Sequence, residues 1–344
     1  MQVVPGQAGT ARLAEVAEPD ADQGSVLVRT LLVGLCGTDH HLVGRRRART
    51  GGPTPAAPLV LGHEAVGMVC AAAGSSGLEP GQLVTGIVRR PCTECAACAR
   101  GDWDFCSSGR YAERGIRGAD GFGRDRWRLE PAYLVPVPAE LGELGVLVEP
   151  MSVVCKAMET AHYVGARVPG APGRRRMLVT GAGPIGLLTA AAGVDAGFDV
   201  TVVDVMAAGV KPDLTVAAGA AYTNDLGALA AERFDLAVEC SGAAGVMPAV
   251  TPMLAQAGVL MLIAGAALAP EQASATARPL VGANGAVVGT VNAGRRHYPQ
   301  AVELLCRLDH DWLGRLITRR VPVAAWTDAL HRHAEDVKVV VDFA

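Results

Sequence analysis

The sequence has few aromatic residues and few charged ones, and its charges nearly cancel. Phe, Trp and Tyr make up 4% of the 344 residues, charged residues make up 19%, and the net charge is −3. A chain this close to neutrality has no general field for holding nucleic acid or an anionic membrane, so we expect neither as a partner. Half of the residues are hydrophobic, which excludes a disordered chain and allows large cores.

Long apolar runs are also lacking. None reaches the roughly 18 residues that a membrane-spanning helix needs, and the longest, at residues 259–269, is interrupted by Gly265. The first twenty residues have neither the basic segment nor the apolar segment of a secretory signal. We therefore expect a cytoplasmic protein.

Glycine, by contrast, is abundant, with 42 residues, which is typical of the tight turns of α/β proteins. Short β-like runs at residues 25–33 and 83–88 stand between Gly and Pro turns and predict a β-rich, barrel-like or sandwich domain. Residues 91–138 are loop-rich. A loop of that length in a compact domain needs a reason, such as a functional site or a bound metal.

From residue 177 onward, apolar runs alternate with Ala-rich stretches. The alternation of strands and helices predicts a parallel sheet covered by helices, a doubly wound sheet of the Rossmann type. The expected strands lie at residues 177–180, 200–204, 234–239, 259–263 and 287–291, and helices are expected at 187–196, 210–219 and 298–308. Residues 337–343 predict a last strand, and residues 287–291 a sheet edge available to a second subunit.

A glycine-rich motif of the G-x-G-x-x-G type lies between the first expected strand and the first expected helix. In this context Gly181 makes the turn, Gly183 lets a pyrophosphate approach the helix N-terminus, and Gly186 packs helix on strand. Asp204, 23 residues after Gly181, closes the next strand, where an acid can bind a ribose 2′-hydroxyl. The two residues after Asp204 are Val and Met, with no Arg for a 2′-phosphate, so NAD is favoured over NADP. The cofactor-binding set is Gly181, Gly183, Pro184, Ile185, Gly186 and Asp204.

Four cysteines crowd into fifteen residues of the loop-rich region: Cys92, Cys95, Cys98 and Cys106. Four sulfurs at this density predict a closed, structural zinc site that pins the loop. An iron–sulfur cluster is the main alternative, and free reduced thiols are the plainer one.

A second set of possible metal ligands is scattered: Cys36 after an apolar strand, His63 and Glu64 at another strand edge, and Glu149 before a proline. One thiolate, one imidazole and one or two carboxylates make an open, catalytic type of zinc site. Spacing alone does not bring these residues together, and each taken singly is more often a structural group.

Two dense basic runs remain, at residues 44–49 and 173–176. The plain interpretation is solvated loops. The sharper one is a local contact with an anionic part of a substrate.

Together these motifs resemble the zinc-dependent medium-chain alcohol dehydrogenase superfamily, through GLCGTDHH, GHEAVG, the four-cysteine segment and GAGPIG. Within it the sequence is most similar to the glucose dehydrogenase branch, through residues 88–91, 113–118, 142–150, 289–292 and 337–343. The resemblance implies a GroES-like catalytic zinc domain of residues 1–165 with 293–344, a structural-zinc lobe at about 91–110, and a Rossmann domain of residues 166–292. It also implies a homodimer or homotetramer.

The resemblance assigns roles to single residues. Cys36 and His63 match the catalytic zinc ligands, and Glu64 is a direct or alternating ligand. Glu149 matches a carboxylate that binds the metal or its water. Thr38 and His41 match a proton relay, Glu113 a position near the sugar, and Asn292 a position near the nicotinamide. Asp39 and His40 are expected to be structural or exposed.

The expected activity is zinc-dependent hydride transfer between a secondary alcohol, such as glucose oxidised to its lactone, and a nicotinamide cofactor. Two alternatives stay open. The first is the same chemistry on a cyclitol, a polyol or an alcohol of specialised metabolism. The second is a relative that keeps the fold as a scaffold and has lost the chemistry.

Overall fold

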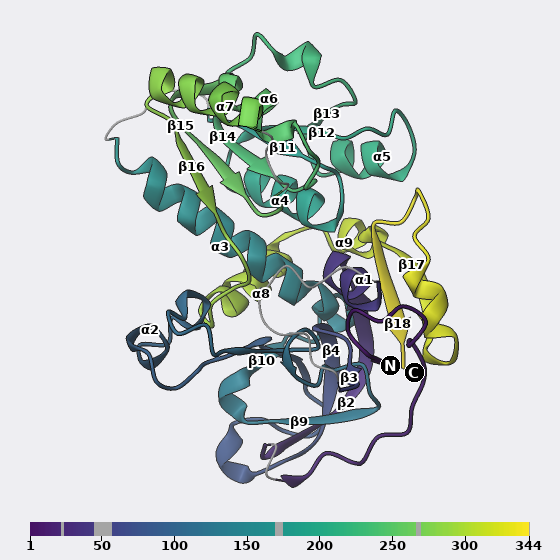
Figure 1. Ribbon diagram of the computed structural model, residues 1–344. Coiled ribbons are helices and arrows are strands. Elements are labelled where there is room, and N and C mark those ends of the chain that lie inside the picture. Colours follow the sequence, from purple (N-terminus) through teal and green to yellow (C-terminus); the bar gives the residue numbers. More distant parts are fainter. Residues whose placement is uncertain (22–23, 45–56, 169–174, 266–269, 344) are drawn as a thin grey trace. The chain divides into compact units, whose positions relative to one another are not determined.

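The computed structural model describes residues 1–21, 24–44, 57–168, 175–265 and 270–343 (Figure 1). Contacts along the chain divide it into two units. The first unit comprises Met1–Ser152 and Asn292–Ala344, and the second comprises Val153–Val291. The expected domain boundary after residue 165 lies at the end of helix α3 (Val148–Gly165), whereas the division by contacts falls inside that helix.

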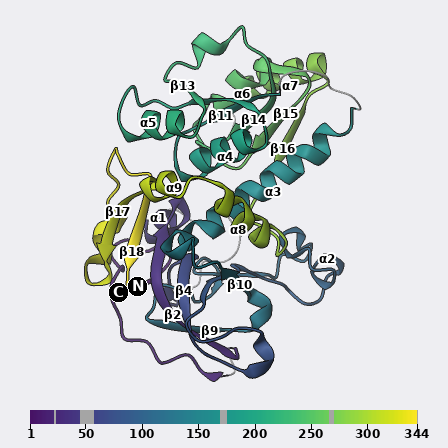
Figure 2. The ribbon, with the colours of Figure 1, turned by 180° about the vertical axis from the view of Figure 1, so that it is seen from behind.

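The first unit is built on a seven-stranded sheet, as expected for a β-rich domain (Figure 2). Six strands follow one path, and β9 (Arg126–Leu129) pairs beside them with β2. In spatial order the path is β10 (Leu134–Val137), β5 (Leu83–Gly86), β4 (Glu64–Ala72), β2 (Val26–Leu35), β18 (Lys338–Asp342) and β17 (Ile317–Pro322). Neighbouring strands are antiparallel except β17 and β18.

The core of this sheet comes from alternation along β2, whose first half is buried at every second residue. Val28 and Val33 pack with Trp127, Phe122 and Trp326, all at most 1% exposed. The rings of Phe122 and Trp127 lie 4.7 Å apart, the spacing of a favourable tilted aromatic pair.

Shorter elements complete the first unit. Two small sheets are formed by β1 (Gln2–Val3) with β3 (Leu59–Val60), and by β6 (Arg89–Arg90), β7 (Ala112–Arg114) and β8 (Gly118–Ala119). The helices are α1 (Gly37–Val43), α2 (Ala96–Ala99), α8 (His297–Arg307) and α9 (His310–Leu316). The 3₁₀ turns are η2 (Gly74–Ser76), η3 (Trp103–Phe105), η4 (Pro131–Tyr133), η5 (Gly142–Leu147) and η8 (Val323–Leu330).

The region expected to be loop, residues 91–138, contributes β9 and β10 to the main sheet. The rest of the segment is mostly turns and irregular backbone, as the loop-rich sequence predicts. The strands were hard to see because each has four residues and carries a polar or proline residue at its centre.

The second unit is a six-stranded sheet in which every neighbouring pair is parallel (Figure 1). Its order is β13 (Ala221–Thr223), β12 (Asp199–Val203), β11 (Arg176–Thr180), β14 (Phe234–Glu239), β15 (Leu254–Leu262) and β16 (Ala286–Gly289). The order reverses direction between β11 and β14, which is the Rossmann-type switch point. The predicted α/β fold class is confirmed.

Helices and 3₁₀ turns connect these strands: α4 (Pro184–Asp195), α5 (Val210–Ala217), α6 (Val246–Val250), α7 (Pro270–Ala283), η6 (Gly227–Leu229) and η7 (Thr251–Met253). Helix α4 is almost wholly buried, which its apolar sequence allows. Among the described residues, no helix is both long enough and apolar enough to cross a membrane.

Candidate functional site

The first candidate metal centre lies where β2 ends and β4 begins. The register pairs Gly34 with Glu64, so the residue that follows β2 and the residue that precedes β4 are brought side by side. The ligand atoms of Cys36, His63 and Glu64 all lie within 4.8 Å of one another. Sγ of Cys36 is 3.1 Å from Nε2 of His63. The structure thus brings together three residues that sequence spacing could not.

The first turn of α1 fixes Cys36. The backbone N–H of Thr38 donates to Sγ of Cys36 at 3.2 Å, while the backbone N–H of Cys36 donates to the carboxylate of Asp39 at 2.9 Å. This reciprocal arrangement is a capping box with a thiol in place of the usual hydroxyl. The helix start therefore sets the position of the sulfur.

Asp39 also faces the imidazole of the site. It is fully buried, and its Oδ1 lies 3.5 Å from Nδ1 of His63. A carboxylate on the far nitrogen of a metal-binding histidine fixes the ring and its tautomer. Burial alone lowers the pKa of His63, but the neighbouring Cys36 and Asp39 raise it well above its usual value. The same negative surroundings favour a bound cation.

Two further charged groups border this centre. Lys338, on β18, is 1% exposed and donates to Oε2 of Glu64 at 2.5 Å. Glu149, on α3, is 7% exposed and outside the group of three ligand atoms. Its burial and the charge of Glu64 raise the pKa of Glu149 to about 7, although His63 and Lys338 oppose this.

Thr38 and His41 lie three residues apart on α1, so their side chains project from one face of the helix. Both are half-buried, and His40 between them is half-buried too. Their relay role stays a prediction.

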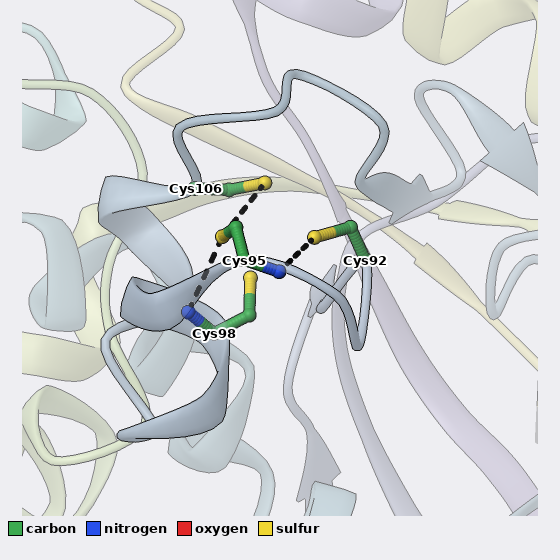
Figure 3. A group of neighbouring side chains, drawn as sticks. All are labelled: Cys92, Cys95, Cys98 and Cys106. Atoms are coloured by element: carbon green, nitrogen blue, oxygen red, sulfur yellow. Dashed lines mark hydrogen bonds between the residues drawn. The ribbon is translucent and has the colours of Figure 1, made fainter.

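The second candidate metal centre is the four-cysteine group, whose ligand atoms also lie within 4.8 Å of one another (Figure 3). Sγ of Cys95 is 4.0 Å from Sγ of Cys106. A tetrahedron with zinc–sulfur bonds of about 2.3 Å has sulfurs about 3.8 Å apart. An iron–sulfur cluster places irons and sulfide between its thiolates and so holds them further apart. The donor set and its size therefore fit a single zinc ion.

Charge within this group is uneven. Backbone N–H groups of Cys98 and Ser107 lower the pKa of the Cys95 thiol to about 5. Burial and the neighbouring sulfurs raise the pKa of Cys98 to about 12. Four adjacent thiols cannot all ionise without a cation between them, and the thiolate is the metal-binding form.

The glycine-rich loop runs from β11 to α4 as the sequence predicts. Gly181 has a φ of 92°, in the region that favours glycine, and a side chain at Gly186 would collide with the carbonyl oxygen of Gly181. Gly183 caps α4, and Pro184 and Ile185 form its first turn. A Cβ at Gly183 would meet nothing within 4 Å, so the space beside it is open to a ligand.

Asp204 follows β12, next to this loop. Its Oδ2 accepts a hydrogen bond from the backbone N–H of Ala182 at 2.7 Å, and its Oδ1 accepts one from Met206 at 3.3 Å. Val205 beside it is 89% exposed. The carboxylate is therefore held at the strand end, beside the glycines that would hold a pyrophosphate.

Glu113 and Asn292 contact each other. Nδ2 of Asn292 donates to Oε1 of Glu113 at 2.7 Å, and the guanidinium of Arg89 donates to the same oxygen at 2.9 Å. The predicted sugar residue and the predicted nicotinamide residue thus form one cluster in the first unit.

The basic runs fall mostly outside the described residues: 45–49 and 173–174 are not described. Arg176 lies within β11, where it donates to Glu232 at 2.5 Å, so it is not part of a solvated loop.

Asp39, expected to be structural or exposed, is buried with its carboxylate beside the His63 ring, a structural position. Sequence reasoning missed two other residues of these clusters. Lys338 was treated only as part of the last expected strand. Arg89 was treated only as part of residues 88–91, which carry the resemblance to the glucose dehydrogenase branch. A buried position in an otherwise apolar strand is a usable signal for Lys338, because a buried lysine needs an anionic partner.

The chain belongs to the medium-chain zinc alcohol dehydrogenase superfamily and, within it, to the glucose dehydrogenase branch. Residues 142–343 match the family model described as "Glucose dehydrogenase C-terminus", and residues 22–139 match "Alcohol dehydrogenase GroES-like domain". The resemblance stated from the sequence is thereby confirmed.

Relatives named glucose 1-dehydrogenase cover nearly the whole chain. That of Methanocella arvoryzae is 34% identical over 99% of this chain and 98% of its own. That of Halobacterium salinarum is 37% identical over 97% of this chain and 96% of its own. A solved glucose dehydrogenase of Haloferax mediterranei, in complex with NADP, Zn and gluconolactone, is 30% identical, with a TM-score of 0.87 over 100% of this chain and 98% of its own.

Proposed function

We propose that this protein oxidises the anomeric hydroxyl of a sugar, with D-glucose as its substrate and the lactone as product, while NAD takes up the hydride and one proton is released. The observation that carries the proposal is the meeting of Cys36, His63 and Glu64 within 4.8 Å, in a chain of the glucose dehydrogenase branch. The names of the full-length relatives and the gluconolactone in the Haloferax mediterranei structure support the substrate.

Two zinc ions fit the donor sets. Cys36, His63 and Glu64, with Glu149 beside them, would hold the catalytic ion, and three protein ligands leave a position open. The second ion belongs to the closed set of four sulfurs, Cys92, Cys95, Cys98 and Cys106. When bound, the catalytic zinc supplies a Lewis acid that favours loss of the hydroxyl proton, and the nicotinamide supplies the hydride acceptor.

The chain's own residues orient the site and move the proton. Asp39 holds the imidazole of His63, and Lys338 balances the charge of Glu64. Thr38 accepts the proton of the substrate hydroxyl through its own hydroxyl, and His41, on the same face of α1, passes it towards solvent. Glu113 accepts a hydrogen bond from another sugar hydroxyl.

Gly181, Gly183 and Gly186, at the C-terminal edge of the parallel sheet, would hold the cofactor, and the N-terminus of α4 would attract its pyrophosphate. Asp204 would accept a hydrogen bond from the ribose 2′-hydroxyl, and its negative charge disfavours a 2′-phosphate. This chain therefore prefers NAD, although the Haloferax mediterranei structure contains NADP, and Asn292 would contact the nicotinamide.

The protein assembles as a homodimer or homotetramer in the cytoplasm. Strand β16 ends the six-stranded sheet, so its outer edge can pair with the same strand of a second copy. Light scattering on the purified protein tests this, and a monomer at micromolar concentration would contradict it.

The test of the activity is the rate of NAD and NADP reduction by zinc-loaded protein with D-glucose. D-galactose, D-xylose, myo-inositol and a simple secondary alcohol are assayed in parallel. We expect fast NAD reduction with glucose and slower NADP reduction. A preference for NADP would contradict the role of Asp204. Oxidation of inositol or the simple alcohol alone, with NAD still bound, would contradict the sugar assignment. No oxidation of any substrate by protein that binds both zinc and NAD would favour the scaffold alternative.

A further inference from the structure

We propose that Arg89 is a positioning residue of the sugar site, whose guanidinium holds Glu113 so that one carboxylate oxygen stays free to accept a substrate hydroxyl. The inference rests on the proposed function, because it concerns how the same site recognises a polyhydroxylated substrate.

The contact between the two side chains is buried. The Arg89 guanidinium donates to Oε1 of Glu113 at 2.9 Å, and each residue is 2% exposed. Oε1 also accepts a hydrogen bond from the side-chain amide of Asn292 at 2.7 Å. Two donors thus occupy one oxygen of the carboxylate and fix its orientation.

The other oxygen has no such partner. Within the described part of the chain, Oε2 of Glu113 and Nε of Arg89 are both buried and make no hydrogen bond. Buried polar atoms are nearly always satisfied, so an acceptor and a donor left over in one ion pair call for a ligand. A hydroxyl group can donate to a carboxylate oxygen and accept from an N–H, so sugar hydroxyls have the required chemistry.

The backbone places Arg89 where it can do this. Arg89 and Glu113 are directly opposite in the β6–β7 pairing, so their side chains leave the same face of the small sheet. The guanidinium also stacks over the ring of Tyr111, 3.6 Å from its centre. Held by a ring on one side and a carboxylate at its end, Arg89 has little freedom to turn away.

The turn that follows Glu113 on β7 packs directly against the loop that carries His63. Gly115, two residues after Glu113, has a φ of 73°, and a Cβ there would lie 2.5 Å from the carbonyl oxygen of Gly62. Gly62 immediately precedes His63. The Glu113 carboxylate therefore belongs to a segment that packs against the loop of a proposed metal ligand. One sugar could place its reacting hydroxyl at the metal site and another hydroxyl at Glu113.

Loss of the guanidinium should leave Glu113 as a buried carboxylate held only by an amide. Such a group turns towards water or takes up a proton, and in either case Oε2 no longer meets the sugar in its original direction. Because this interaction is made with a hydroxyl that does not react, it should act on sugar binding more than on the chemical step.

The test is Arg89→Met, assayed as zinc-loaded enzyme. We expect KM for D-glucose to rise about tenfold or more, with kcat within about threefold and KM for NAD unchanged. Arg89→Lys restores the charge without the planar fork, so its KM should lie between those of wild type and Arg89→Met. In Arg89→Ala, which leaves an open space beside Glu113, added guanidinium ion should lower the KM for D-glucose by restoring a donor to the carboxylate.

Arg114→Met is the matched control. Arg114 neighbours Glu113 on β7, but its guanidinium donates to the carbonyl of Asp120 and not to Glu113. Its loss should leave KM for glucose unchanged. Thermal unfolding of all variants checks that they fold.

Monodeoxyglucoses identify the hydroxyl concerned. With the wild type, one of these analogues should have a higher KM than glucose. With Arg89→Met, the KM values of that analogue and of glucose should become nearly equal. An active wild type combined with folded Arg89→Met or Arg89→Lys variants of unchanged KM would overturn the inference alone. An equal rise in KM for every monodeoxyglucose with the wild type would also overturn the inference. A wild type that binds zinc and NAD but oxidises no sugar would instead overturn the proposed function, and the inference with it.

Discussion

The buried pair of Lys338 and Glu64 gives a sharp prediction about stability. Lys338 is 1% exposed and Glu64 is 2% exposed, with Nζ and Oε2 2.5 Å apart. Burial by itself lowers the pKa of Lys338, but the Glu64 carboxylate raises it above its ordinary value, so the lysine is charged at neutral pH. Lys338→Met should lower the free energy of unfolding of the metal-free protein by about 3–5 kcal/mol, because Glu64 is left as an uncompensated buried charge.

The assay is urea unfolding followed by far-ultraviolet circular dichroism. The double variant Lys338→Met with Glu64→Gln should recover more than half of the loss, because no charge then remains unpaired. Zinc should also recover part of the loss in Lys338→Met, because it brings a positive charge to the same carboxylate. A cost below about 1 kcal/mol in the metal-free single variant, the size of an exposed ion pair, would refute this reasoning.

Three further predictions follow from the second unit, the cysteine group and an ion pair. Gly186→Ala should lower the melting temperature and abolish NADH binding, because the alanine side chain would collide with the carbonyl oxygen of Gly181. Gly183→Ala should fold normally and lose only NADH affinity. Equal melting temperatures for wild type and Gly186→Ala would contradict this. Cys98→Ser should remove about one zinc ion per chain by elemental analysis and make the loop more sensitive to proteolysis, and unchanged zinc content would argue against a four-sulfur site. Burial raises the pKa of Asp336, but the Arg319 guanidinium and the backbone N–H of His333 together lower it below its usual value, so Asp336→Asn should cost about 1 kcal/mol at pH 7. This contribution to stability is present above the pKa of Asp336 in the unfolded chain and is lost as pH falls through its lower pKa in the folded protein. The urea midpoints of wild type and Asp336→Asn should therefore converge towards pH 3. A constant difference between the midpoints down to that pH would contradict the assignment.

Much of the second unit could be predicted from sequence because its elements are local. The strands at residues 177–180 and 234–239 and the helix after Gly183 follow from apolar runs interrupted by glycine. Helix α3, which contains Pro150, was not among the helices predicted from the sequence. Pro150 lies in the first helical turn, where no intrahelical N–H bond is lost.

The candidate site was predicted only in part because its contacts are long-range. Cys36 and His63 are 27 residues apart, and Lys338 is 274 residues from Glu64. No spacing rule connects such pairs: the pairing of β2 with β4 and of β18 with β2 makes the connection. The four cysteines lie close in sequence, so that group could be predicted from spacing alone.

The central claim is that Cys36, His63 and Glu64 form the catalytic zinc site of a sugar dehydrogenase. Zinc content and glucose-dependent NAD reduction, measured on the same samples of wild type and Cys36→Ser, test it most directly. We predict that Cys36→Ser keeps its fold, falls from about two zinc ions per chain to about one, and loses about a thousandfold or more in rate. Undiminished glucose oxidation by a Cys36→Ser protein with one zinc ion would contradict the account.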